Sequence, residues 1–195
     1  MPLSLDEVHD LIDSWVIRRE VETLGPATEL FARMAVGDPG RLDVLQVIAD
    51  HQALRGNVDG ALALLDQAGP TGEDDADVLQ AMRVAYLVEG GREEAEPLLQ
   101  ELRRRGPRLR DEAIERVADA LEHAGRLREA MRWFTIGLRD LDPHQDLPEH
   151  EEEYALIGRW RVRQALDLPP DHYDTLARQT LEARRARSAD EWGWD

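Results

Sequence analysis

The 195-residue chain contains no cysteine, so disulfide bonds and thiolate metal sites are excluded. It also contains no lysine, and all 24 of its basic residues are arginine. Aromatic residues make up only 5% of the chain, while alanine and leucine are prominent, a composition that suits packed helices better than a β-sheet. The 41 acidic residues outnumber the arginines and give a net charge of −17, which disfavours nucleic acid and anionic membranes as partners.

Further absences narrow the function. No apolar run is long enough to span a bilayer, and the first residues lack the basic region and apolar core of a signal peptide, so we expect a cytoplasmic protein. Residues 88–92 form a glycine-containing turn without the spacing or lysine of a phosphate-binding loop. The chain has neither a His-Glu-x-x-His motif nor a nucleophile elbow. We therefore predict no enzymatic activity and no cofactor.

Three histidines flank one loop near the C-terminal end of the chain. His144, His150 and His172 would need to come together, with Glu151, to hold a metal ion. Histidines in a loop without a fixed spacing are usually solvated, so the sequence predicts no metal site there.

A short pattern recurs four times along the chain. It consists of an alanine followed four residues later by a large apolar residue, and the alanines are 34, 34 and 35 residues apart. A glycine precedes each of the last three alanines by five residues. The alanines are Ala27, Ala61, Ala95 and Ala130, the large residues Phe31, Leu65, Leu99 and Phe134, and the glycines Gly56, Gly90 and Gly125. A repeat of this length is typical of a helix–turn–helix unit that buries its apolar face only against neighbouring units.

The pattern resembles the tetratricopeptide repeat (TPR), in which glycine, alanine and a large apolar residue hold the fifteenth, twentieth and twenty-fourth positions. In this register the repeats begin at Val8, Leu42, Ala76 and Asp111. The resemblance covers residues 8–144 and implies an all-α fold, a right-handed α-solenoid of about four TPR-like helix pairs. Two departures make the first repeat degenerate. Trp15 stands where a small residue is expected, and Glu22 replaces the turn glycine.

We expect three parts in the chain. Residues 1–144 form the four helical hairpins, residues 149–187 form C-terminal capping helices, and residues 188–195 form a flexible acidic tail that contains Trp192 and Trp194. Pro169 and Pro170 separate the two capping helices, and Asp171 is placed to cap the second one. The stretch 156–171 also resembles the tail of uncharacterised bacterial TPR proteins, for which no chemistry is assigned.

The resemblance implies a concave groove, lined by the second, fifth, ninth and twelfth positions of each first helix. These positions share one helix face. In repeats two to four the predicted partner-binding residues are Asp43, Gln46 and Asp50; Asp77, Gln80, Val84 and Leu87; and Glu112, Glu115, Asp119 and Glu122. Their carboxylates, with few arginines nearby to neutralise them, favour a basic partner, and Val84 and Leu87 would accept an apolar anchor.

The sequence thus predicts a non-enzymatic scaffold that binds a protein or peptide segment. We expect this segment to be basic, because the groove is acidic. The lysine and asparagine with which the best-known TPR domains hold a peptide carboxylate are absent at these positions, so that function is not transferred. Two alternatives remain open. The groove acids form a solvated face, or the chain is a structural protein that forms homo-oligomers through its C-terminal helices or tail.

Overall fold

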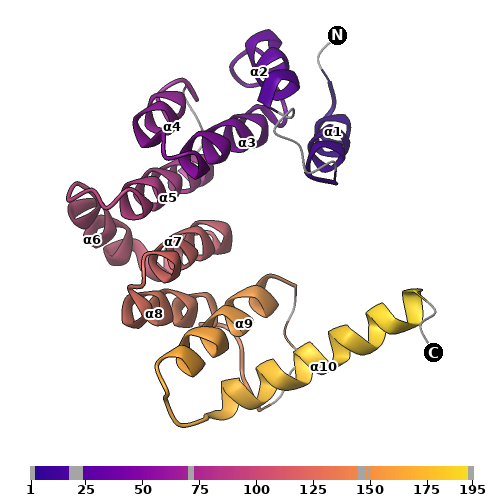
Figure 1. Ribbon diagram of the computed structural model, residues 1–195, viewed down its shortest axis with the longest axis vertical. Helices are drawn as coiled ribbons and strands as arrows, with labels where there is room; N and C mark the ends of the chain where they lie inside the picture. The colour runs from indigo at the N-terminus through magenta and orange to yellow at the C-terminus, as the bar shows by residue number, and fades with distance from the viewer. Residues whose placement is uncertain (1–2, 18–23, 70–72, 145–147, 149, 193–195) are drawn as a thin grey trace. The chain divides into compact units, whose positions relative to one another are not determined.

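The computed structural model describes residues 3–17, 24–69, 73–144, 148 and 150–192 (Figure 1). Over these residues the chain forms ten α-helices and one short 3-10 helix, and no strand. The prediction of an all-α fold is therefore confirmed. The chain divides into two compact units, Met1–Arg92 and Glu93–Asp195, each with its own internal packing.

The described part of the N-terminal unit has five helices: α1 (Leu5–Ile17), α2 (Leu24–Arg33), α3 (Arg41–Leu54), α4 (Val58–Leu65) and α5 (Glu73–Glu89). Helix α3 packs against α1, α2 and α4, and α4 also contacts α5. A reciprocal cap starts α1, because the backbone N–H of Ser4 donates to Glu7 at 2.8 Å and the N–H of Glu7 donates to the Ser4 hydroxyl at 3.3 Å. Asn57 caps α4 by accepting from the N–H of Gly60 at 3.1 Å.

The described part of the C-terminal unit contains α6 (Ala95–Arg105), the 3-10 helix η2 (Gly106–Arg108), α7 (Asp111–His123), α8 (Leu127–Gly137), α9 (His150–Ala165) and α10 (His172–Trp192). Helix α8 contacts both α7 and α9, and α9 also contacts α7 and α10. Helix α9 is therefore covered by other helices on two sides, as Figure 1 shows.

The recurring pattern marks buried positions in four helices, α2, α4, α6 and α8. The four alanines are at most 1% exposed, and the four large residues that follow them are at most 8% exposed. Residues four apart lie on the same side of a helix, so each pair fills one layer of the core. The burial predicted for Ala61, Ala95 and Ala130 is confirmed. In the first hairpin Leu11 remains 37% exposed, in agreement with a degenerate repeat.

The glycines reverse the chain as expected in two turns and differently in the third. Gly56 (φ 79°) and Gly125 (φ 73°) adopt the left-handed conformation that glycine tolerates best. After α5 this conformation falls on Gly91 (φ 64°) instead of Gly90. Gly90 serves a close approach, because a Cβ atom there would lie 2.9 Å from Cγ2 of Val58.

The interface between α8 and α9 is tight because glycine provides room. A Cβ atom on Gly158 of α9 would lie within 2.4 Å of the Phe134 ring on α8. On α8, a Cβ atom at Gly137 would lie 3.0 Å from the Cβ atom of Ala155. Any larger residue at Gly158 would push α9 away from α8.

The last helix extends further than the sequence predicted. Helix α10 continues to Trp192 instead of ending near Arg187. The rest of the tail, with Trp194 and the side chain of Trp192, lies outside the described residues. None of the described helices has both the length and the apolar content needed to cross a membrane.

Candidate functional site

The predicted groove residues are divided between the two units. Helix α3 carries Asp43, Gln46 and Asp50; α5 carries Asp77, Gln80, Val84 and Leu87; and α7 carries Glu112, Glu115, Asp119 and Glu122. The first two sets belong to the N-terminal unit and the third to the C-terminal unit. The structure therefore provides two sets of acids, which we describe separately.

The α5 residues are largely buried. Val84 is fully buried, and Asp77 and Leu87 are only 5% and 6% exposed. Val84 and Leu87 therefore offer no open apolar anchor, contrary to the sequence-based expectation. The reason lies in the composition of α5, where buried apolar residues occur on nearly every side between Val78 and Val88; a helix that is apolar all round is a buried helix.

The ninth-position aspartates share one kind of partner. Asp50 on α3 accepts a hydrogen bond from the hydroxyl of Tyr86, at 2.8 Å and 36 residues later. Asp119 on α7 accepts one from Tyr154, 35 residues later on α9. Each pair connects one helix to a helix about one repeat further along the chain. Burial, the hydrogen bond to Asp119 and the charges of Asp119 and Glu115 raise the pKa of Tyr154 above its ordinary value, so its hydroxyl stays protonated and donates.

The acids of the C-terminal set on α7 are contacted by an arginine of the same unit. We call Glu112, Glu115, Asp119 and Glu122 the α7 acidic face. Arg161 of α9 donates from Nε and Nη2 to the two carboxylate oxygens of Glu122, at 2.6 Å each. Its Nη2 atom also lies 3.8 Å from Asp119. The hydrogen bonds to Glu122 raise the pKa of Arg161, and the pair is bidentate, the strongest arrangement for these groups. The sequence-based expectation that few arginines neutralise these acids does not hold for Asp119 and Glu122.

The spacing of the arginines in α9 explains this contact. Arg159 and Arg163 are four residues apart and lie on one side of the helix, whereas Arg161 lies about half a turn away from both. The helix therefore presents one arginine to α7 and two to α10. The alternating Arg-x-Arg-x-Arg pattern of residues 159–163 is the sequence signal that could have identified α9 as a helix between two acidic surfaces.

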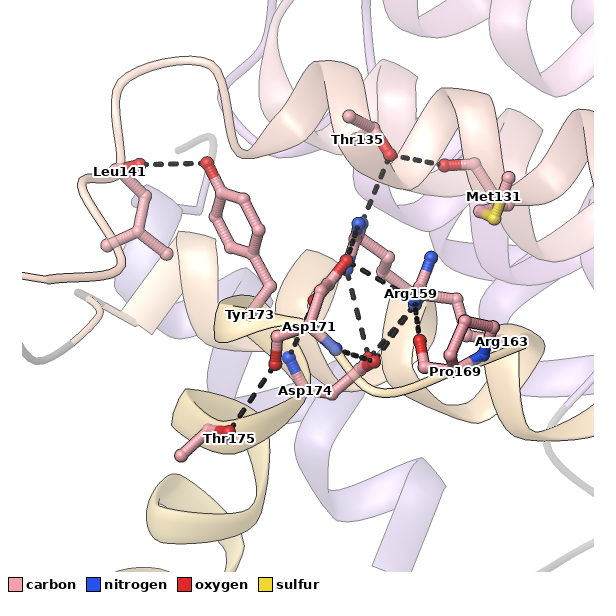
Figure 2. Close-up of polar contacts among 10 residues, drawn as sticks. All are labelled: Met131, Thr135, Leu141, Arg159, Arg163, Pro169, Asp171, Tyr173, Asp174 and Thr175. Carbon is pink, nitrogen blue, oxygen red and sulfur yellow. Dashed lines mark hydrogen bonds and ion pairs between the residues drawn. The ribbon is translucent and has the colours of Figure 1, made fainter. Parts of the chain in front are cut away.

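Arg159 and Arg163 form a largely buried charge network with Asp171 and Asp174 (Figure 2). Arg159 donates to both oxygens of Asp171 at 3.2 and 2.6 Å, and Nε of Arg163 lies 3.0 Å from Oδ2 of Asp174. Nη2 of Arg163 also donates to the carbonyl of Pro169 at 2.5 Å. The side chains of Arg159, Arg163 and Asp174 are only 10%, 12% and 3% exposed. We call these four residues the arginine–aspartate network.

Two residues of the same network, Asp171 and Asp174, also cap the N-terminus of α10. The N–H of Asp174 donates to Asp171 at 3.1 Å, and the N–H of Asp171 donates to Asp174 at 2.9 Å, a reciprocal cap that confirms the predicted role of Asp171. Desolvation raises the pKa of Asp171, but the hydrogen bonds from Arg159 and the Asp174 N–H, with the charges of both arginines, outweigh it and lower this pKa overall.

One residue of the N-terminal set, Asp43, borders an open cleft with a volume of about 430 Å³, which we call the N-terminal cleft. The other residues of that set do not line it, namely Gln46, Asp50, Asp77, Gln80, Val84 and Leu87. The cleft lies among the start of α1, the turn before α3 and the starts of α3 and α5. Its lining residues are Leu5, Gly37, Asp38, Pro39, Gly40, Arg41, Leu42, Asp43, Ala68 and Asp75. The cleft thus combines three carboxylates with the apolar surface of Leu5, Pro39, Leu42 and Ala68.

The guanidinium of Arg41, which also lines the cleft, is held in place. Its Nη1 and Nη2 atoms donate to the carbonyls of Ala68 and Gln67 at 2.9 and 3.2 Å, and its Cζ atom lies 4.1 Å from the centre of the Phe31 ring. Asp43 is 2.9 Å from Nε2 of His9, and both side chains remain about half exposed, 42% and 51%. The acidic edge of the cleft is therefore accessible to solvent at Asp43.

A second, smaller cleft lies in the same unit. It has a volume of about 250 Å³ and is lined by residues of the α3–α4 turn and the end of α5, including Tyr86 and Glu89. The ion pair between Arg92 and Asp59, at 2.7 Å, crosses its edge. This pairing leaves it with a weaker acidic character than the N-terminal cleft.

Among the described residues no group of three or more His, Asp or Glu side chains is placed to hold a metal ion. The chemistry that the N-terminal cleft offers is the binding of a cation with an apolar stem, because carboxylates and aliphatic side chains line the same space.

Comparisons with protein-family models, with curated proteins and with solved structures give no match to this chain.

Proposed function

We propose that the protein is a non-catalytic interaction module, acting in the cytoplasm, that binds a basic segment of a protein partner in the N-terminal cleft. Stacking of its hairpins as a right-handed TPR-like solenoid belongs to the same proposal. The single observation that carries it is the N-terminal cleft, where Asp38, Asp43 and Asp75 stand beside apolar walls. Stacked helical hairpins commonly present such surfaces to peptides.

The chemistry of the cleft selects the kind of side chain that enters. Arginine and lysine have a long apolar stem and a charged end, so the stem can pack against Leu5 and Leu42 while the charge faces Asp43. The net charge of −17 accelerates the approach of such a segment, and salt weakens this attraction. We expect roughly micromolar affinity, as for a transient contact.

The α7 acidic face is a weaker candidate for the same role, since Arg161 and Tyr154 already contact Glu122 and Asp119. A basic partner would have to displace a bidentate arginine there. The proposal therefore places the partner on the N-terminal unit and gives α7 a structural role in holding α9.

The test is a binding measurement with synthetic peptides in which one arginine and one large apolar residue are varied. The double charge reversal Asp43→Arg with Asp75→Arg should lower affinity at least about tenfold, and the dependence on salt should become shallow. Glu29→Arg is the matched control, because Glu29 is exposed on α2 of the same unit and does not line the cleft. Equal affinity of both variants for the peptides would refute the proposal.

A second candidate function is self-association through α10. Among the residues of this helix whose side chains are described, the last buried one is Thr180, and residues 182–186 are exposed, although the helix continues to Trp192. In this exposed stretch Arg184 lies 3.5 Å from Glu153 of α9. A helical end with so few buried residues is marginal in water, so a neighbouring molecule would stabilise it. Light scattering on the full chain and on a chain ending at Ala186 tests this; identical monomer masses would exclude it.

A further inference from the structure

Two histidines that are distant in the sequence are in contact in the C-terminal unit. The rings of His144 and His172 have centroids 4.3 Å apart, and their planes are tilted by 60°. His144 follows α8, and His172 is the first residue of α10. Both residues are exposed, so a dissolved ion can reach their ring nitrogens.

The backbone around both rings is held in place. The hydroxyl of Tyr173 donates to the carbonyl of Leu141 at 3.2 Å, which ties the segment after α8 to the start of α10 (Figure 2). The N–H of His144 donates to Asp142 at 2.9 Å, and the reciprocal cap of Asp171 and Asp174 fixes the first turn of α10. The two imidazoles are therefore in contact because the fold holds the segment after α8 against the start of α10.

We propose that His144 and His172 together bind one divalent transition-metal ion, zinc or copper, with water completing its coordination. Imidazole nitrogen is a preferred ligand of both ions, and each bond to zinc needs about 2.0–2.1 Å. Rings whose centres are 4.3 Å apart reach a common ion with only a small rotation of the side chains.

The charges near the pair also favour a cation. Asp142 and Asp171 lie within two residues of His144 and His172 in the sequence, and Asp140, four residues before His144, is 81% exposed. Arg139 pairs with Asp111 and Asp140, and Arg159 pairs with Asp171, so these guanidinium groups are engaged with carboxylates.

The ion would join the segment after α8 to α10, two parts of the chain that are 28 residues apart. Because only two protein ligands contribute, the site is open and exchangeable, unlike a closed structural zinc site with four protein ligands. Copper should bind more tightly than zinc, as imidazole sites generally do.

The test uses the full chain without a histidine tag, titrated with Zn²⁺ and with Cu²⁺ by calorimetry. Loss of a residue that merely supports a ligand lowers metal affinity about 10- to 100-fold, so His144→Ala and His172→Ala should each cost at least that much. His123→Ala is the control, because His123 is exposed at the end of α7 and away from the paired rings. It should leave the affinity unchanged.

A second measurement separates binding from any effect on folding. Zinc should raise the midpoint of thermal unfolding of the wild type and of His123→Ala, but not that of the double variant His144→Ala with His172→Ala. All variants should unfold at the same temperature without metal. Absence of binding by the wild type, or equal binding by the double variant, would overturn the proposal.

Discussion

The α7 acidic face and the N-terminal cleft are both rich in carboxylates, but they differ in what surrounds these groups. The repeat register assigned all four acids of α7 to a groove, whereas of the three acids that line the cleft it assigned only Asp43. On α7, Arg161 and Tyr154 of the same chain contact two of the four acids. In the N-terminal cleft, the carboxylate of Asp43 lies beside His9, and both side chains are about half exposed. The cleft itself has an open volume of about 430 Å³.

The difference shows that a cluster of like charges does not by itself mark a binding surface. Helix α9 supplies an arginine on each of its sides, so the acids of α7 and those at the start of α10 both become part of the internal packing of the C-terminal unit. Among the described residues of the N-terminal unit, the Asp43 carboxylate instead has the half-exposed His9 at 2.9 Å. The α7 acids that meet Arg161 and Tyr154 are therefore part of the packing of their unit, whereas Asp43 stays 42% exposed.

The largest effect should follow from loosening α9 on its α10 side. Asp174→Ala leaves Arg163 and Arg159 largely buried with only Asp171 to compensate them, and such losses cost about 3–5 kcal/mol. We expect a value near the lower end of that range, because Asp171 remains. Urea unfolding followed by tryptophan emission measures it well, since four of the five tryptophans lie in the C-terminal unit.

Asp140→Ala is the control for this variant. Asp140 belongs to the same unit but is 81% exposed, so its loss should change the unfolding midpoint little. If both variants unfold at the same urea concentration, the arginine–aspartate network does not anchor α9, and the contrast between the two acidic surfaces loses its structural basis.

The second-largest expected effect comes from adding side-chain volume to the core of each unit, which shows how tightly each core is packed. Ala61→Leu and Ala130→Leu each add volume at a fully buried position and should cost about 1–3 kcal/mol. We expect the larger cost at Ala130, because α8 is fixed between α7 and α9 by the close approaches at Gly137 and Gly158. Ala63→Leu, at an exposed position of α4, provides the control in urea unfolding. Unfolding curves identical to that of the wild type would show that the repeat register is misplaced.

Much of the fold followed from the sequence because the signals were local and repeated. The alanine and the large residue four places later are both needed in every hairpin, so Ala61 with Leu65 and Ala130 with Phe134 were correctly placed in the core. Asp171 was correctly predicted as a cap because capping depends on residues three apart.

The candidate site was predicted less well because it depends on distant pairs. Val84 and Leu87 satisfy the groove register, but α5 is apolar on nearly every side and is buried there. Arg161 meets Glu122 across 39 residues, and no local pattern specifies that distance. The contact of His144 with His172 likewise depends on how the segment after α8 returns to α10, which spacing alone does not reveal.

Arg161→Ala tests directly whether the contact from α9 is what separates the two surfaces. The loss should cost about 1 kcal/mol, because the pair is bidentate but Arg161 is half exposed and screened by water. The variant should also bind an arginine-containing peptide more strongly than the wild type does, because removal of Arg161 frees the Glu122 carboxylate, which is 18% exposed in the wild type. Arg128→Ala on α8 is the control, since Arg128 is exposed and is not part of this contact. Unchanged peptide binding would mean that the α7 acidic face is not a latent basic-peptide site.

The smallest expected effect is on the stability of the fold at acid pH. It distinguishes the reciprocal cap at the start of α10 from the one at the start of α1. The pKa of Asp171 in the folded protein lies below its ordinary value of 3.8, because the arginines and the Asp174 N–H outweigh desolvation. Its contribution to stability is therefore fully present above pH 3.8 and is lost as the pH falls through the lower, folded value. Asp171→Asn should be less stable than the wild type at neutral pH and should lose less stability over that acid range.

Glu7, in the cap of α1, provides the comparison. The backbone and side-chain hydrogen bonds from Ser4 lower the pKa of Glu7 as well, but Glu7 is exposed. Glu7→Gln should therefore change the loss of stability in acid less than Asp171→Asn does. Urea unfolding of the three proteins between neutral pH and the acid range measures both differences. Parallel pH profiles for the wild type and Asp171→Asn would show that this carboxylate is not held in its charged form by the network.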